Sequence, residues 1–184
     1  AFSVRDVGRA RELARSLLAE PLPRRWAHTQ GVAATACRIA PIMGEDAELL
    51  ESAAWLHDIG YAPAVAQTGF HPLDGARFLR ACGAADEVLC SLVAHHTGAI
   101  HEARERGLDG ELAGEFTGPP SLLGDALTYC DITTSPDGEP IDVIERIADV
   151  QHRYGPEHPV SRAIRAAAET CLRSVRRIEA LLAT

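Results

Sequence analysis

A histidine and an aspartate stand side by side at the end of an apolar segment, in the stretch W-L-H-D-I-G at residues 55–60. The apolar residues before the pair predict that it is buried, where an unpaired charge costs several kcal/mol. A metal explains such a pair best. An imidazole donates a ring nitrogen to one ion, and the two oxygens of a carboxylate can bridge two ions. We therefore expect the fold to bring further ligands to His57 and Asp58.

The composition favours helices. The chain has 184 residues, of which 46% are apolar but only 5% aromatic, and alanine and leucine dominate. This balance favours helix over sheet, and the length suits one domain with a real core. We therefore predict an all-α helical bundle that forms a single domain over residues 1–184.

Apolar periodicity and stop signals divide the chain into helices. The predicted segments are 4–19, 24–43, 46–59, a helix that begins at 71, then 85–96, 121–133, 141–154 and 160–182. Residues 61–70 are expected to form a loop. Residues 97–120 contain repeated glycines and the pair Pro119-Pro120. A connection of that length is usually a functional lid or is poorly ordered, so this stretch is expected to influence substrate choice.

Further metal-ligand residues lie at the ends of these helices. His28 begins an inward face of the second helix, and His71 stands at the entrance of the fourth, before a proline that suits the first turn. Asp131 ends an apolar run. His95 and His96 end the fifth helix and point about 100° apart, so we expect only one to bind the same ion. We choose His95 as that ligand.

Charge and cysteines indicate the partners and the compartment. The formal net charge is −8, which disfavours binding to a nucleic-acid polymer. The sequence has no apolar run of about 18 residues and no basic-then-apolar leader, so we expect a cytoplasmic protein without a membrane partner. The five cysteines have no C-x-x-C spacing and are expected to be buried small hydrophobes in a reducing cytosol. Arginines on the terminal helix are expected to form a solvated face or the contact of a homodimer.

The set His28, His57-Asp58 and Asp131 resembles the H…HD…D signature of the HD superfamily of metal-dependent phosphohydrolases, and the H-D-I-G tetrad matches especially well. The resemblance covers roughly residues 24–135, with the first and last helices outside it. His71 and His95 look like the second-metal ligands of the binuclear branch.

This resemblance implies an HD-domain bundle with two divalent transition-metal ions. His28, His57, Asp58 and Asp131 would hold one ion, and bridging Asp58 with His71 and His95 would hold the other. Mixed nitrogen and oxygen ligands suit Fe, Mn, Co, Ni or Zn. Two such ions leave a residual positive charge beside the two aspartates, which attracts phosphate. The implied activity is hydrolysis of a small phosphorylated metabolite or nucleotide by metal-activated water.

Three branches of the superfamily resemble this chain. Dinucleoside tetraphosphate hydrolases are similar around R-W-A-H-T at residues 25–29 and H-H-T-G at residues 95–98. Cyclic-di-GMP phosphodiesterases share the ligand order, but the lysine usual after H-D-I-G is Tyr61 and their G-Y-P stretch is absent. Mixed-valence di-iron oxygenases use the same cage, often with a histidine where this chain has Tyr61. Phosphodiesterase, oxygenase and ligand-sensor functions therefore stay open as alternatives.

Four residues near the ligands are candidates to act on substrate. Arg25 is the expected phosphate clamp, because a guanidinium binds phosphate through two parallel bonds. His96 and Thr97 are expected to orient a metal ligand or the phosphate. Tyr61, next to the H-D-I-G tetrad, is expected to contact substrate or support a ligand.

Overall fold

The computed structural model describes residues 6–83 and 86–184, which are helical throughout apart from their connections and one isolated antiparallel bridge between Thr134 and Pro140. The all-α prediction is confirmed. The helices are α1 (Val7–Leu18), α2 (Pro23–Ile39), α3 (Ala47–Leu56), α4 (His71–Ala81), α5 (Glu87–His95), α6 (Ala99–Arg106), α7 (Asp109–Glu115), α8 (Ser121–Ile132), α9 (Val143–Tyr154) and α10 (Pro159–Leu182). The short 3₁₀ turns are η1 (Ala40–Ile42), η2 (Gly44–Asp46), η3 (Ile59–Tyr61) and η4 (His96–Gly98).

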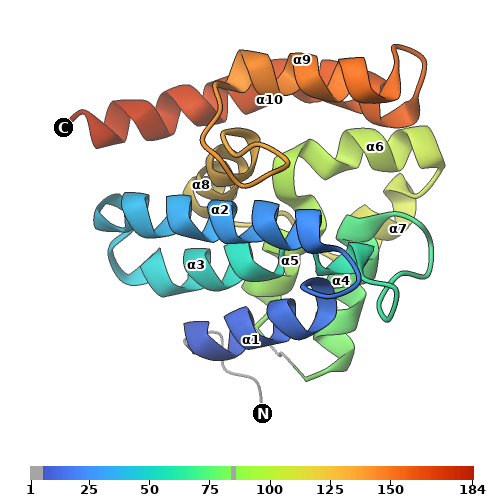
Figure 1. The fold of residues 1–184 in the computed structure, drawn as a ribbon, viewed down its shortest axis with the longest axis horizontal. Coiled ribbons are helices and arrows are strands. Elements are labelled where there is room, and N and C mark those ends of the chain that lie inside the picture. The colour runs from blue at the N-terminus through green and yellow to red at the C-terminus, as the bar shows by residue number, and fades with distance from the viewer. Residues whose placement is uncertain (1–5, 84–85) are drawn as a thin grey trace.

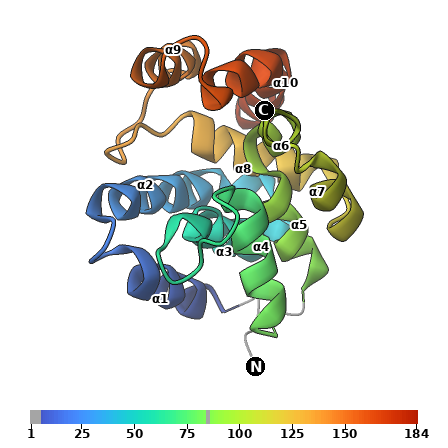
Figure 2. The same cartoon turned by 90° about the vertical axis from the view of Figure 1, so that its right-hand side faces the viewer.

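The helices form a bundle with an outer layer on one side. Helix α3 packs against α1 and α2, and α4 packs against α5. Helix α8 contacts α2, α3 and α5 on one side and α10 on the other. Figures 1 and 2 show α9 and α10 lying together on one side of the molecule and α1 on the opposite side. The metal-ligand candidates therefore come from helices that meet in the middle of the bundle.

Small and aliphatic side chains make the core between these helices. The predicted inward face of α2 is confirmed, because Val32, Ala36 and Ile39 are all buried with His28. Short alanine side chains let helix axes approach closely, so polar groups that project from these faces are shut away from water. This packing carries His28 into the interior.

Residues 97–120 do not form the expected loop or disordered segment. They fold into η4, α6 and α7, and Gly107 ends α6 in the left-handed conformation (φ 71°) that glycine adopts without steric cost. Leu112 and Phe116 are buried, which anchors α7 to the bundle. Arg77 of α4 also binds Glu111 and Glu115 of α7. The expectation of an irregular connection is therefore wrong, whereas the influence of this stretch on substrate choice stays a prediction.

The cysteine prediction holds for only three of the five residues. Cys90, Cys130 and Cys171 are buried, but Cys37 and Cys82 are exposed, and all five are free thiols. Cys37 lies beside Glu51, with Sγ 3.0 Å from a carboxylate oxygen.

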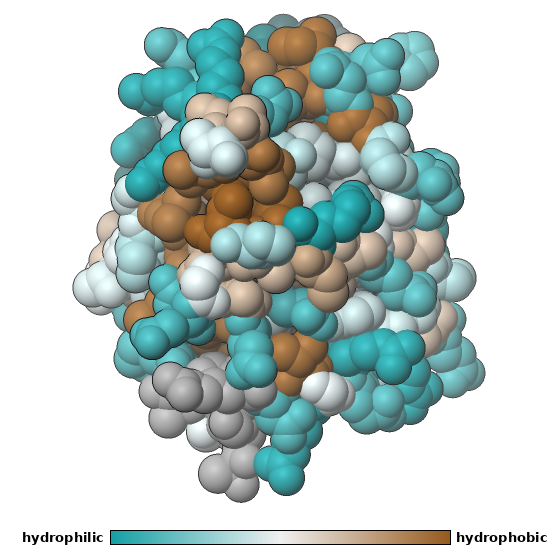
Figure 3. Space-filling model, turned by 90° about the vertical axis from the view of Figure 1, so that its left-hand side faces the viewer, coloured by the Kyte–Doolittle hydropathy of each residue, from teal (hydrophilic) through white to brown (hydrophobic). Residues whose placement is uncertain are grey.

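Features of the helices and of the surface relate to the expected absence of a membrane partner and to the expected homodimer. None of the helices in the described ranges is long and apolar enough to cross a bilayer. Two arginines of α10 form ion pairs within the chain, Arg162 with Glu105 at 3.1 Å and Arg177 with Asp125 at 2.7 Å. Figure 3 shows hydrophobic side chains gathered near the middle of the face at the C-terminal end of α10, bordered by hydrophilic ones. A homodimer stays a prediction.

Candidate metal centre

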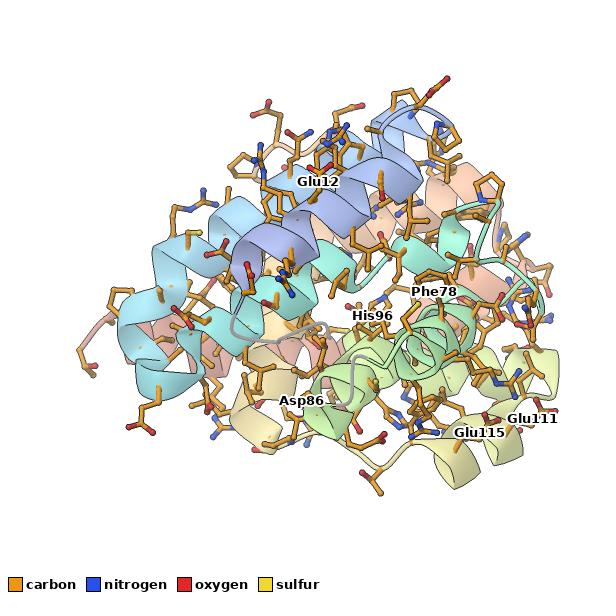
Figure 4. All side chains as sticks on the ribbon, turned by 90° about the horizontal axis from the view of Figure 1, so that it is seen from below. Glu12, Phe78, Asp86, His96, Glu111 and Glu115 are labelled. Carbon is orange, nitrogen blue, oxygen red and sulfur yellow. The ribbon has the colours of Figure 1, made fainter. Side chains whose placement is uncertain are left out.

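Four histidines and two aspartates converge where the helix ends meet. His28 comes from α2, Asp131 from α8, and His57 with Asp58 from the turn after α3. His71 opens α4 and His96 opens η4. Figure 4 shows His96 inside the bundle, whereas Glu111 and Glu115 lie at its edge on α7.

The two carboxylate oxygens of Asp58 face two different groups of imidazoles. Oδ2 lies 3.2 Å from Nε2 of His57 and 3.7 Å from Nε2 of His28. Oδ1 lies 3.3 Å from Nε2 of His71 and 3.6 Å from Nε2 of His96. A carboxylate divided in this way has the geometry of a bridge between two ion positions.

Two clusters have ligand atoms close enough to hold a metal ion. They are His28, His57 and Asp131, and His57, Asp58 and His96, each with its ligand atoms within 4.8 Å of one another. The buried Nε2 of His57 has no hydrogen-bond partner among the described residues, although carboxylate oxygens of Asp58 and Asp131 lie 3.2 and 3.5 Å away. An unpaired buried nitrogen is costly, and a cation between it and those oxygens would satisfy all three groups. The residues present therefore fit a transition-metal ion.

Backbone carbonyls orient three of the four imidazoles. Nδ1 donates to the carbonyl of Ala54 at 2.7 Å in His57 and to the carbonyl of Val93 at 2.7 Å in His96. In His28 the acceptor is the carbonyl of Ser135, at 2.9 Å. Because a carbonyl only accepts, Nδ1 carries a proton in all three, and Nε2 is the nitrogen that faces the centre and can bind an ion when it is deprotonated.

His95 does not take the place predicted for it. Its Nε2 donates to the carbonyl of Phe116 at 2.8 Å and so faces α7 instead of Asp58. His96 occupies the expected position, with its Nε2 3.2 Å from that of His71. The helical turn breaks between the two, because His95 has φ −111° and His96 begins a 3₁₀ turn. The structure therefore places His96 beside Asp58, where His95 was expected.

Arg25 and Tyr61 cover the centre on one side. The Arg25 guanidinium donates to Asp58 Oδ2 at 2.9 Å and lies over the Tyr61 ring at 4.1 Å. The other face of that ring stacks on His71, with centroids 3.9 Å apart. Both residues thus lie beside the ligands, as expected, and both line the cavity over the centre.

Thr97 contacts the carboxylate oxygen of Asp131 that does not face His28. Its hydroxyl donates to Asp131 Oδ2 at 2.6 Å, while Asp131 Oδ1 faces His28 Nε2 at 2.8 Å. Thr97 adopts the left-handed conformation (φ 51°), the one described residue other than glycine to do so. Such strain persists where the surroundings enforce it, often at functional sites. The expected supporting role of Thr97 agrees with this contact.

Glycines allow the close approaches that assemble the centre. A Cβ on Gly60 would lie 2.0 Å from the carbonyl oxygen of His71, so the turn after Asp58 touches the start of α4. A Cβ on Gly31 would lie 2.3 Å from the carbonyl oxygen of Gly138, which seats the 134–140 turn on α2 and brings the Ser135 carbonyl to His28.

Asp74 has a structural role that the sequence did not reveal. In the first turn of α4 it is buried and accepts from the backbone N–H groups of Gln67 and Thr68 and from the Thr68 hydroxyl. The carboxylate therefore ties the loop before α4 to that helix and supports His71 at its entrance.

In the protein without ions, the surroundings shift the pKa values of the ligand residues in different directions. Burial lowers the pKa of His57, but the carboxylates of Asp58 and Asp131 outweigh it and raise that pKa to about 10. Burial raises the pKa values of Asp58 and Asp131, yet His57 and other cations hold both well below the usual range. Burial lowers the pKa of His71, which keeps this imidazole neutral near pH 7.

A cavity opens onto the centre. Its polar lining residues include Arg25, Thr97, Glu102 and Arg146. Apolar lining comes mainly from α9 and α10, with the side chains Val150, Val160, Ala163 and Ile164. Glu102 belongs to the 97–120 stretch that was expected to influence substrate choice. No sequence signal pointed to Arg146, because it belongs to no motif and lies far along the chain from the H-D-I-G tetrad.

Comparison with known proteins matches the chain to a protein family and to part of a longer protein. Residues 25–154 match the HD domain family. Ribonuclease Y of Rubrobacter xylanophilus is 40% identical over 70 residues, which are 38% of this chain and 14% of that protein. This chain therefore spans a small part of that relative. No solved structure matches.

The family match covers more than two thirds of the chain and contains every residue that the structure gathers around Asp58. The chain belongs to the HD domain family, within the HD superfamily of metal-dependent phosphohydrolases.

Proposed function

We propose that the protein is a binuclear metal-dependent phosphohydrolase that acts on a small phosphorylated metabolite or nucleotide. The observation that carries this proposal is the division of Asp58, whose Oδ2 faces His57 and His28 and whose Oδ1 faces His71 and His96. A second carboxylate, Asp131, completes the first group through His28. Four imidazoles and two carboxylates suit two divalent ions among Fe, Mn, Co, Ni and Zn.

The ligand assignment follows from these distances. His28, His57, Asp131 and Asp58 Oδ2 would hold one ion, and Asp58 Oδ1, His71 and His96 the other. When bound, such ions make water acidic enough to supply a nucleophile near neutral pH and stabilise the charge on the leaving oxygen.

The chain's own residues would position the phosphate. Asp58 Oδ2 is the present partner of Arg25, and a carboxylate engaged by ions would release that guanidinium to a phosphate oxygen. The Tyr61 ring holds the guanidinium at the mouth of the centre through its face. Thr97 keeps Asp131 in a fixed orientation through its hydroxyl, which preserves the ligand geometry while substrate enters.

Phosphodiesters belong on the substrate panel beside phosphomonoesters. The name of the relative from Rubrobacter xylanophilus describes an enzyme that cleaves RNA, and RNA linkages are phosphodiesters. The proposal therefore covers both ester types, with the preference to be measured.

The test is hydrolysis of 4-nitrophenyl phosphate and bis(4-nitrophenyl) phosphate by protein loaded with Mn²⁺ or Fe²⁺, under strictly anaerobic conditions. We expect release of 4-nitrophenol without O₂, and loss of at least about 100-fold in Asp58→Asn, because the bridging carboxylate serves both ion positions. The matched control Asp137→Asn changes an exposed aspartate of the 134–140 turn and should keep full activity. Absence of hydrolysis in every metal-loaded form would refute the proposal. Substrate turnover that requires O₂ would instead support an oxygenase on the same ligands.

A further inference from the structure

A second groove adjoins the metal centre and has its own lining. It lies between the N-terminal end of α2, the 134–140 turn and α9, and Arg24 and Arg153 line this groove but not the cavity over the ligands. Arg25, Tyr61 and Arg146 line both this groove and the cavity over the ligands. The two spaces therefore adjoin each other at these three side chains.

The groove is basic in an acidic protein. The chain carries 26 acidic residues against 18 basic ones. Yet the described residues that line the groove include four arginines and no carboxylate. A local concentration of guanidinium groups against the overall balance indicates a site for an anion.

Existing ion pairs leave these arginines with spare capacity. Arg24 is paired with Asp137 at 2.9 Å, but its side chain is 62% exposed. Arg146 and Arg153 share a single carboxylate, Asp149, at 3.3 and 3.1 Å. Each guanidinium has five N–H donors. Each of these arginines can therefore bind a further anion and keep its present partner.

The N-terminal end of α2 adds to the positive potential. This helix has 17 residues, begins with Pro23, and its N-cap residue Leu22 provides no side-chain acceptor for the first turn. Leu22, Pro23 and Arg24 all line the groove. The free N–H groups and the helix dipole favour an anion at this end.

Tyr61 separates the groove from the ligands. One face of its ring stacks on His71 and the other lies under Arg25, so the ring is held in place from both sides. A substrate that reaches both spaces must pass along the exposed edge of this ring.

We propose that the groove is a second phosphate subsite and that the substrate carries two phosphate groups, one at Asp58 and one among Arg24, Arg146 and Arg153. The inference rests on the proposed function for the first phosphate. The groove would recognise the second phosphate, the one that lies away from Asp58. The alternative is that these arginines form only surface ion pairs, which contribute little free energy.

The experiment compares hexyl phosphate with hexane-1,6-diyl bisphosphate, which differ in the second phosphate alone, and repeats the pair with propane and nonane spacers. Binding to Mn²⁺-loaded protein is measured by calorimetry at constant ionic strength, with 4-nitrophenyl phosphate turnover followed in parallel. We expect at least one bisphosphate to bind roughly tenfold or more tightly than its monophosphate, since charge-assisted bonds to guanidinium are strong. The advantage should shrink as salt is added.

The variant Arg24→Ala/Arg153→Ala should remove most of that advantage, with hexyl phosphate affinity and 4-nitrophenyl phosphate turnover unchanged. The matched control Arg173→Ala/Arg176→Ala alters two exposed arginines of α10 outside the groove and should keep the advantage. The subsite is refuted if no bisphosphate binds better, or if the advantage survives in the groove variant. If no aryl phosphate is hydrolysed by any metal-loaded form, the proposed function fails instead, and the calorimetry still decides the groove.

Discussion

Two adjacent histidines at the end of α5 illustrate what single residues reveal. The sequence indicated that one of the pair binds a metal, because consecutive helical side chains diverge. It did not indicate which one. Residues 89–94 are all buried, so α5 lacks the polar face that would show which direction points to the centre. The choice between His95 and His96 depends on the break of the helix at this point and on the carbonyl of Phe116.

His96→Ala and His95→Ala are a matched pair that tests this assignment. His96→Ala should lower bound metal from two ions to about one and reduce hydrolysis by at least about 100-fold, because it removes an imidazole beside Asp58 Oδ1. His95→Ala should keep both ions, with a modest loss of stability from the bond to Phe116. Elemental analysis of the purified variants gives the answer. Equal metal loss in both would contradict the geometry.

His57 predicts the pH dependence of metal binding. With its pKa raised from 6.5 to about 10 in the protein without ions, the imidazole is charged at neutral pH and must lose its proton to become a ligand. Metal affinity should therefore rise with pH up to about pH 10, by as much as tenfold per unit. Calorimetry in buffers of different ionisation enthalpy should detect about one proton released per protein from this group at pH 7.5. A metal affinity that is independent of pH between 6.5 and 9 would contradict this view.

At the scale of elements, the long amphipathic helices could be predicted from the sequence, but the structure of the segments that connect them could not. The faces of α2 and α8 could be predicted from apolar spacing. Residues 97–120 could not, because glycine weakens a helix by about 1 kcal/mol and the stretch contains several. Burial of Leu112 and Phe116 overrides that local preference.

Gly60 tests the contact between the turn after α3 and the start of α4. Gly60→Ala would place a methyl 2.0 Å from the carbonyl oxygen of His71, so backbone must move, at a cost of about 1–3 kcal/mol or more. We expect a lower unfolding midpoint in urea and weaker binding at the ion position that includes His71. Gly110→Ala in α7 is the control, because nothing lies within 4 Å of its added methyl; it should be neutral or slightly stabilising. Similar effects of both substitutions would show that the close approach is unimportant.

At the scale of the molecule, the core and the metal centre are separable. Aliphatic side chains from α1 to α8 make a continuous core, while most of the ligands stand at or next to helix ends. The all-α architecture therefore followed from composition. The arginine groove did not, because it joins residues of α2 and α9 that are more than a hundred positions apart, and no local pattern reports such a meeting.

Removal of metal should therefore leave the protein folded. After treatment with a chelator we expect an unchanged helical circular dichroism signal at 25 °C and a lower melting temperature. Ligand binding at 100 times the dissociation constant contributes about 2.7 kcal/mol to stability, and this part is lost. Return of Mn²⁺ should restore the original melting temperature. Collapse of the helical signal on chelation would mean that the ions are structural.

The backbone carbonyls of Ala54, Val93 and Ser135 select the tautomers of His57, His96 and His28. Every amino acid provides such a carbonyl, so substitutions at these three supporting positions keep the acceptor as long as the helix ends stay in place. The orientation of the three imidazoles therefore does not depend on which side chains stand at residues 54, 93 and 135. Catalytic variants can be sought by changing the cavity wall on α9 and α10 while the orientation of these three imidazoles stays constant.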